Sequence, residues 1–138
     1  MNTIYTISDC GLIDIATFTD ERGSLSVWEN LLFFAPKRVF WMHHIAAGAI
    51  RGSHAMLTGS EILVAVHGAF KVDLDDGVEK TSIVLNDPTK GLFLRPGIWS
   101  QTHSYSSDCV ALVLADEEYC RDGYVYDYEE WVMMKAAQ

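Results

Sequence analysis

Apolar residues alternate with polar residues along most of this chain, and short turn signals interrupt the alternation at regular intervals. A period of two is typical of strands that bury one face, because successive side chains of a strand point to opposite sides. Many short strands in a small chain are typical of a sandwich or a barrel, so we expect an all-β fold. The alternation predicts strands at 4–7, 12–18, 25–28, 38–45, 61–66, 69–74, 82–85, 91–94 and 110–114.

The C-terminal segment differs, because its apolar residues recur at helical spacing. Tyr128, Trp131, Val132 and the aliphatic stem of Lys135 fall at i, i+3, i+4 and i+7 behind an acidic first turn. This spacing predicts a short C-terminal helix. Between the strands, Asp76-Gly77 is a strong hairpin signal and predicts a type I′ turn.

Length, composition and charge exclude several classes of protein. A chain of 138 residues has the length of one domain, so we expect a single domain over 1–138. Hydrophobic residues make up 49% of the chain, which is enough for a core and excludes intrinsic disorder. The formal net charge of −9 repels phosphate backbones and anionic lipids. We therefore expect neither a nucleic-acid partner nor a membrane partner.

The cysteines indicate the compartment. Cys10, Cys109 and Cys120 are odd in number and show no C-x-x-C spacing. The first residues contain neither the basic region nor the continuous apolar stretch of a secretory signal. These features predict reduced thiols in a cytoplasmic protein.

One set of spaced residues carries chemical information. Five residues separate Gly48 from His54, Met56 follows after one spacer, and Glu61 and Gly68 follow after four and six more. This pattern nearly reproduces the cupin metal motif G-x5-H-x-H-x4-E-x6-G, with methionine in the second histidine position. Alternation places positions 54 and 56 on one face of a strand, and Glu61 returns from the next strand toward the same interior.

The donor set of this motif is too small for a metal site. Divalent metals take three or four nitrogen, oxygen or sulfur donors, and a thioether is a poor ligand for hard or borderline ions. His54 and Glu61 alone would make a weak site, and Met56 fits the core of a small barrel. We expect no metal and no cofactor.

Five segments in order resemble a known family. They are D-E-R-G-S-L at 20–25, K-R-V at 37–39, R-G-S-H-A at 51–55, L-D-D-G at 74–77 and the stretch from Trp99 to Cys109. Together they resemble the WxcM-like sugar 3,4-ketoisomerases, cupins that act on dTDP-4-oxo-6-deoxyhexoses. The similarity extends over about residues 12 to 130, which is nearly the whole chain.

The resemblance implies both an architecture and a reaction. The implied fold is a metal-free cupin-type jelly-roll barrel, assembled as a homodimer whose N-terminal strands are exchanged, with a dTDP-linked sugar at the barrel mouth. The implied reaction of deoxysugar and polysaccharide biosynthesis moves a ketone from C4 to C3 through an enediol. It needs a base for the carbon-bound proton and donors for the developing oxyanion. Some relatives work beside an acyltransferase.

Several departures fall on the active-site positions of that family. The family motif R-G-x-H-A-H has a second histidine, the expected proton shuttle, where this chain has Met56. The family has tyrosines after K-R-V where this chain has Phe40 and Trp41, and histidine or arginine where it has Ser100. A ketoisomerase with an altered site is the leading hypothesis. The alternative is a nucleotide-sugar-binding pseudoenzyme without turnover.

His54 is the candidate catalytic base, because it matches the first histidine of the family motif and an imidazole titrates near neutral pH. A neutral core histidine satisfied by hydrogen bonds is an equally good interpretation at this point. Arg51, and with less support Arg22, are candidates to bind the pyrophosphate through the forked guanidinium.

The remaining candidates would line the substrate pocket. Trp99 is a candidate to stack on thymine or on the sugar, and alternation with Trp99 predicts that His103 also lines the interior. Glu61 is predicted to point inward and to orient His54. Met56 and Ser100 complete the predicted pocket at the positions where the family has its other active-site side chains.

Overall fold

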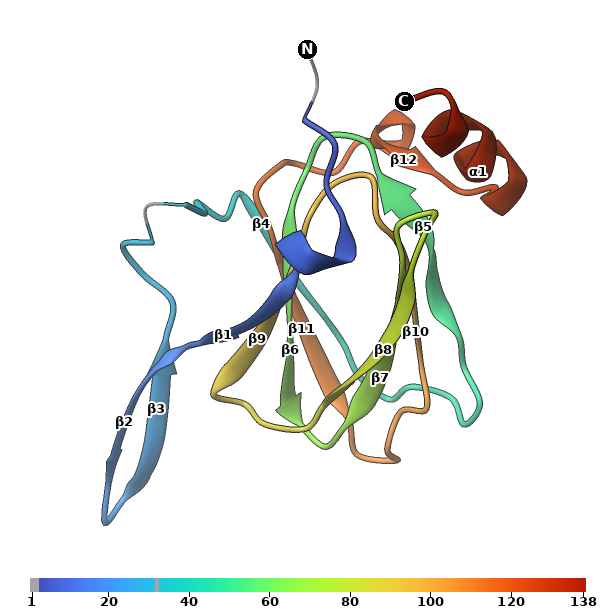
Figure 1. Ribbon diagram of the computed structural model, residues 1–138. Helices are drawn as coiled ribbons and strands as arrows, with labels where there is room; N and C mark the ends of the chain where they lie inside the picture. The colour runs from blue at the N-terminus through green and yellow to red at the C-terminus, as the bar shows by residue number, and fades with distance from the viewer. Residues whose placement is uncertain (1–2, 32) are drawn as a thin grey trace.

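The computed structural model describes residues 3–31 and 33–138, and its centre is a pair of five-stranded antiparallel sheets that face each other (Figure 1). One sheet has the order β1 (Gly11–Asp14), β9 (Lys90–Leu94), β6 (Glu61–His67), β11 (Val110–Ala115) and β4 (Arg38–Met42). The other has the order β12 (Tyr124–Val125), β5 (Arg51–Met56), β10 (Trp99–His103), β7 (Phe70–Asp75) and β8 (Lys80–Leu85). The all-β jelly-roll architecture expected from the sequence is confirmed.

The core lies between the two sheets and follows the alternation of the strands. On β7, Phe70, Val72 and Leu74 are buried against the opposite sheet, whereas Lys71 and Asp73 lie on the outer face. On the facing sheet, β6 and β11 are buried on both faces, because a second cluster packs over their outer side. That cluster consists of Phe34, Ile62, Val64, Phe93 and Leu114, with Trp28 against it.

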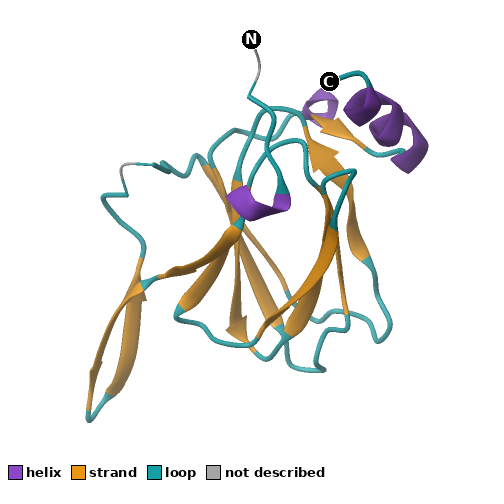
Figure 2. Cartoon of the chain, in the orientation of Figure 1, coloured by secondary structure: helices purple, strands orange, loops and turns teal. Residues whose placement is uncertain are grey.

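Short helices gather at one end of the sheets, near the chain termini (Figure 2). The 3-10 helices are η1 (Ile7–Asp9) and η2 (Arg121–Gly123), and the α-helix is α1 (Tyr128–Ala136). Asp127 caps α1 by accepting a 2.8 Å hydrogen bond from the Glu130 amide. The predicted C-terminal helix is therefore confirmed. Among the described helices, none is long and apolar enough to cross a membrane.

The hairpin β2 (Ala16–Asp20) and β3 (Gly23–Val27) projects away from both sheets (Figure 1). Its strands pair only with each other in the described part of the chain, and Phe18 lies opposite Leu25 in the register. These two side chains are 66% and 60% exposed. An isolated two-stranded hairpin is at best marginally stable in water, so this one needs a further contact.

Local polar contacts explain two of the differences between the predicted strands and the structure. Residues 4–7 form no strand, because the Thr6 amide donates to the Asp9 carboxylate at 2.8 Å and starts η1 instead. The β7–β8 hairpin occurs where it was predicted, but its loop has four residues rather than the two of a type I′ turn. The Asp76 carboxylate holds this longer loop by accepting from the amides of Val78 and Glu79.

We expect Trp131→Ala to lower the free energy of unfolding by about 3–5 kcal/mol. Trp131 is the buried side chain of α1, where it packs with Ala55, Trp99 and Val125, and its indole N–H donates to the Gly97 carbonyl at 2.9 Å. Urea unfolding followed by circular dichroism measures the loss.

Met133→Ala is the matched control on the same helix. Met133 is 73% exposed, so its truncation should change the free energy of unfolding by less than about 0.5 kcal/mol. Equal losses in the two variants would contradict the role assigned to the indole.

Candidate active site

A cavity of about 480 Å³ opens between the sheets, and both sheets supply polar groups to it. Arg38 enters from β4 and Glu61 from β6, whereas Arg51 and His54 enter from β5. Ser100 and Thr102 of β10 add hydroxyl groups. The rest of the lining is apolar or aromatic. Its apolar wall consists of Phe40, Met42, Leu63 and Val113, and its three phenol rings belong to Tyr119, Tyr124 and Tyr126. This mixture of apolar wall and convergent polar groups is typical of a small-molecule site.

A β-bulge brings Arg51 and His54 to the same cavity. In the pairing of β5 with β10, His54 lies opposite Ser100 and Gly52 lies opposite Gln101, so Ser53 is an extra residue. Gly52 and Ser53 have φ of 79° and 55°, and positive φ at such positions is a common feature of bulges. Strict alternation would place residues 51 and 54 on opposite faces. The bulge cancels that alternation, and both side chains line the cavity.

His54 is half-buried among aromatic rings. Its ring centroid lies 4.8 Å from that of Tyr124 and 6.0 Å from that of Tyr126, both in edge-on geometry. Burial lowers the pKa of His54, and the positive charge of Arg38 lowers it further, against a backbone contact from Gly52. The imidazole is therefore neutral near pH 7, the state in which it can accept a proton.

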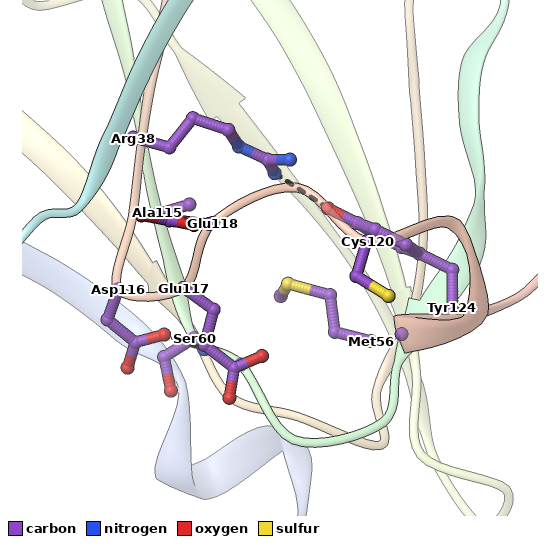
Figure 3. A pocket seen from close by; sticks show the side chains of 11 residues that line it. Arg38, Met56, Ser60, Ala115, Asp116, Glu117, Glu118, Cys120 and Tyr124 are labelled. Atoms are coloured by element: carbon purple, nitrogen blue, oxygen red, sulfur yellow. Dashed lines mark hydrogen bonds between the residues drawn. The ribbon is translucent and has the colours of Figure 1, made fainter.

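Arg38 makes several polar and aromatic contacts at the cavity. Its Nη2 atom donates to the Tyr124 hydroxyl at 2.6 Å, the contact drawn as a dashed line in Figure 3, and lies 3.6 Å from Glu61 Oε1. The guanidinium also covers the rings of Phe40 and Tyr119, at 5.0 and 5.4 Å from their centroids. Among the described residues, its buried Nε has no hydrogen-bond partner.

Glu61 is the buried carboxyl of the cavity. Burial raises its pKa to about 7, although the Arg38 charge acts in the opposite direction. The carboxyl therefore titrates near neutral pH, and its nearest cation is Arg38. Glu61 points inward as the motif spacing predicts, since it lines the cavity that also contains His54.

The second histidine position of the family motif belongs to the apolar core. Met56 is 5% exposed and packs in the cluster between the sheets. It also lines a neighbouring pocket of about 20 Å³, which shares Arg38 and Tyr124 with the larger cavity (Figure 3). That volume holds about one water molecule. Met56 thus lies beside the cavity as a packing residue.

Two predicted pocket residues lie on the other face of β10, and the prediction for them is wrong. Trp99 packs outside the cavity against Trp131, Val125 and Ala55. His103 bonds the Asp73 carboxylate at 2.8 Å on the same outer face. Trp99 and His103 do lie on the same face of β10, as the alternation predicts, but that face is the outer one. The residues of β10 that enter the cavity are Ser100 and Thr102.

Arg22 lies far from the cavity of its own chain, at the tip of the β2–β3 hairpin. It pairs with the Asp20 carboxylate at 2.5 Å, and its side chain is exposed. Within one chain, the structure therefore brings together Arg51, His54, Glu61 and Ser100 but not Arg22.

Sequence reasoning assigned no role to Arg38, Thr102 or the tyrosines. Arg38 lies inside the K-R-V segment that resembles the family, so a usable signal was present. The tyrosines follow β11 in a segment without regular alternation, and periodicity gives no direction for their side chains. Among residues 3–31 and 33–138, no group of three His, Cys, Asp or Glu side chains is arranged to hold a metal ion.

Comparison with known proteins gives a consistent result. The family described as WxcM-like, C-terminal (FdtA) matches residues 8–136. A curated relative, the TDP-4-oxo-6-deoxy-alpha-D-glucose-3,4-oxoisomerase of Aneurinibacillus thermoaerophilus, is 35% identical over 122 residues, which cover 87% of this chain and 88% of the relative.

Solved structures agree with the sequence comparison. WlaRA, a TDP-fucose-3,4-ketoisomerase from Campylobacter jejuni, superposes with a TM-score of 0.87 at 32% identity, over 92% of this chain and 96% of that one. QdtA, a sugar 3,4-ketoisomerase from Thermoanaerobacterium thermosaccharolyticum in complex with TDP, gives a TM-score of 0.91 at 28% identity, over 96% and 98%. The match covers nearly the whole chain, and the chain belongs to the WxcM-like (FdtA) family of cupin-fold proteins.

Proposed function

We propose that this chain is a TDP-4-oxo-6-deoxyhexose 3,4-ketoisomerase, which moves the ketone from C4 to C3 through an enediol. Its family and its 35% identical relative support this assignment, because that relative is named for the same isomerisation. The observation that carries the proposal is the position of His54, a neutral imidazole in a cavity that also holds two arginines.

In this proposal His54 moves the carbon-bound proton. The neutral imidazole takes the proton from C3, and the electron pair moves toward the C4 carbonyl oxygen. The cationic side chain of Arg38 lines the same cavity and stabilises the negative charge that develops on oxygen. Return of the proton to C4, together with transfer of a second proton from the C3 hydroxyl to the C4 oxygen, completes the isomerisation.

Arg51 is the proposed pyrophosphate ligand. It is exposed yet lines the cavity, so it lies where the cavity meets solvent. A guanidinium binds phosphate oxygens through two parallel hydrogen bonds. QdtA was solved in complex with TDP, which supports a TDP-linked ligand for this chain as well. The free thiols of Cys10, Cys109 and Cys120 support a cytoplasmic location for the reaction.

The test of this function is His54→Asn. We expect the turnover of TDP-4-oxo-6-deoxyglucose to fall by roughly 10²- to 10⁴-fold, since the variant keeps a polar side chain but loses the base. TDP affinity, measured by isothermal titration calorimetry, should stay within about two-fold. His67→Asn is the control, because His67 is exposed and pairs with Asp108 outside the cavity. A His54→Asn variant with unchanged turnover would contradict the assignment.

We further propose that the protein is a homodimer in which the β2–β3 hairpins are exchanged. The hairpin needs a further contact, and its exposed Phe18 and Leu25 match the exposed apolar Val39 and Trp41 on the outer face of β4. A second copy of this chain supplies both surfaces at once. In that assembly Arg22, at the hairpin tip, would lie against the partner subunit.

The proposed dimer predicts that charged residues introduced on the hairpin weaken the association of the two subunits. We expect the wild-type protein to sediment as a dimer, and Phe18→Glu with Leu25→Glu to shift it toward monomer, because two carboxylates would be buried in the interface. Val78→Glu is the control: Val78 is 93% exposed in the β7–β8 loop, away from the hairpin. A wild-type protein that sediments as a monomer at micromolar concentration would contradict the proposal.

A further inference from the structure

The proposed reaction moves two protons, and one histidine accounts for only one of them. A proton leaves C3 and one arrives at C4, while a second proton leaves the C3 hydroxyl and one arrives at the C4 oxygen. Among the described residues that line the cavity, His54 supplies the one imidazole, and Met56 has no ionisable group. The oxygen-bound proton therefore needs another group in the same cavity.

The cross-strand neighbour of Met56 is such a group. In the pairing of β12 with β5, Tyr124 lies directly opposite Met56, and directly opposed residues of an antiparallel pair have their side chains on the same face. The phenol of Tyr124 thus enters the cavity next to the position where the family motif has its second histidine. It lines the cavity together with His54, whose ring centroid is 4.8 Å from its own.

The contact with Arg38 fixes the direction of the phenol proton. A guanidinium carries only donors, so in the 2.6 Å contact Arg38 donates and the Tyr124 oxygen accepts. The proton of Tyr124 itself is then left to point at another acceptor. The positively charged guanidinium of Arg38 also lies beside the phenol oxygen, and it stabilises the phenolate that forms when Tyr124 donates its proton.

The other tyrosines of the cavity are held less firmly. Tyr119 and Tyr126 are exposed, whereas Tyr124 is partly buried and bonded to Arg38. Burial raises the pKa of Tyr124, and the contact with Arg38 opposes that rise. The phenol consequently carries its proton near neutral pH and starts the reaction as an acid.

We propose that Tyr124 is a second catalytic residue, which exchanges protons with the sugar oxygens while His54 exchanges them with the sugar carbons. This assignment rests on the proposed ketoisomerase function. Tyr124 donates its proton to the C4 oxygen as His54 removes the proton from C3, and a C3–C4 double bond forms. The resulting enediol is neutral, and the Tyr124 phenolate is held by Arg38.

The second half of the reaction restores both side chains. The Tyr124 phenolate takes the proton from the C3 hydroxyl, the C3 carbonyl forms, and the imidazolium of His54 gives its proton to C4. One proton has moved from C3 to C4 through His54, and one has moved between the oxygens through Tyr124. No electron acceptor or donor is required, since the enzyme ends in its starting state.

Tyr124→Phe tests the proposal, because it removes one oxygen and keeps the ring against His54. We expect kcat to fall by roughly 10²- to 10⁴-fold, with the dissociation constant for TDP within about two-fold of wild type. Exchange of the C3 proton with D₂O solvent should slow in parallel, since Tyr124 acts in the step that forms the enediol. The urea midpoint identifies any variant that is simply unfolded.

Tyr128→Phe is the matched control. It also removes a phenol oxygen from a 2.6 Å hydrogen bond, here to the Asp75 carboxylate on the outer face of the sheet. Its kcat should equal that of wild type within about two-fold. A second readout is trifluorotyrosine at position 124, whose more acidic phenol should move the alkaline limb of the pH profile of kcat to lower pH.

The outcomes separate this assignment from the function on which it rests. An inactive wild-type protein would overturn the ketoisomerase itself. An active wild type whose Tyr124→Phe variant keeps its kcat would overturn only the role of Tyr124. That role would also be overturned if Tyr124→Phe slows product formation but leaves the C3 exchange rate unchanged, or if the pH profile does not move with trifluorotyrosine.

Discussion

The contacts of Arg38 organise the functional end of this fold. Its guanidinium extends from β4, faces Glu61 of β6 in the same sheet and donates to Tyr124 of β12 in the opposite sheet. One side chain thus joins the two sheets beside the cavity. Because Glu61 is buried, loss of this cation would leave a buried carboxyl without its partner, an arrangement that is strongly destabilising. Arg38 and Glu61 therefore form a buried polar pair among the residues that line the cavity.

The bulge in β5 is the second constraint on the site. Ser53 is the extra residue, and it lets Arg51 and His54 approach one ligand from a single strand. Gly52 makes the bulge possible. A Cβ atom added there would lie 3.2 Å from the Ser100 carbonyl oxygen, and its backbone has a positive φ that residues with a side chain rarely adopt. Backbone geometry, and not only the choice of side chains, thus places a cation beside the candidate base.

Much of the fold was predictable from the sequence, because alternation and turn residues are local signals. The core strand β7, the hairpin after it and α1 all follow from such signals. Alternation groups residues by face but does not say which face is the interior, and for this reason Trp99 and His103 were placed on the wrong side of β10. The pairing of Tyr124 with Met56 joins residues 68 positions apart, and no local pattern contains such information. The motif resemblance supplied His54 but not the phenol beside it.

The central claim is that this cavity catalyses isomerisation although the family's second histidine is replaced by Met56. Proton NMR of the wild-type protein with TDP-4-oxo-6-deoxyglucose in D₂O tests it most directly. The account predicts that signals of a 3-oxo isomer appear and that deuterium from the solvent enters the sugar at C3 or C4. Broadened sugar signals with neither exchange nor a new isomer would contradict it, and would instead support a cavity that binds the nucleotide sugar without turnover.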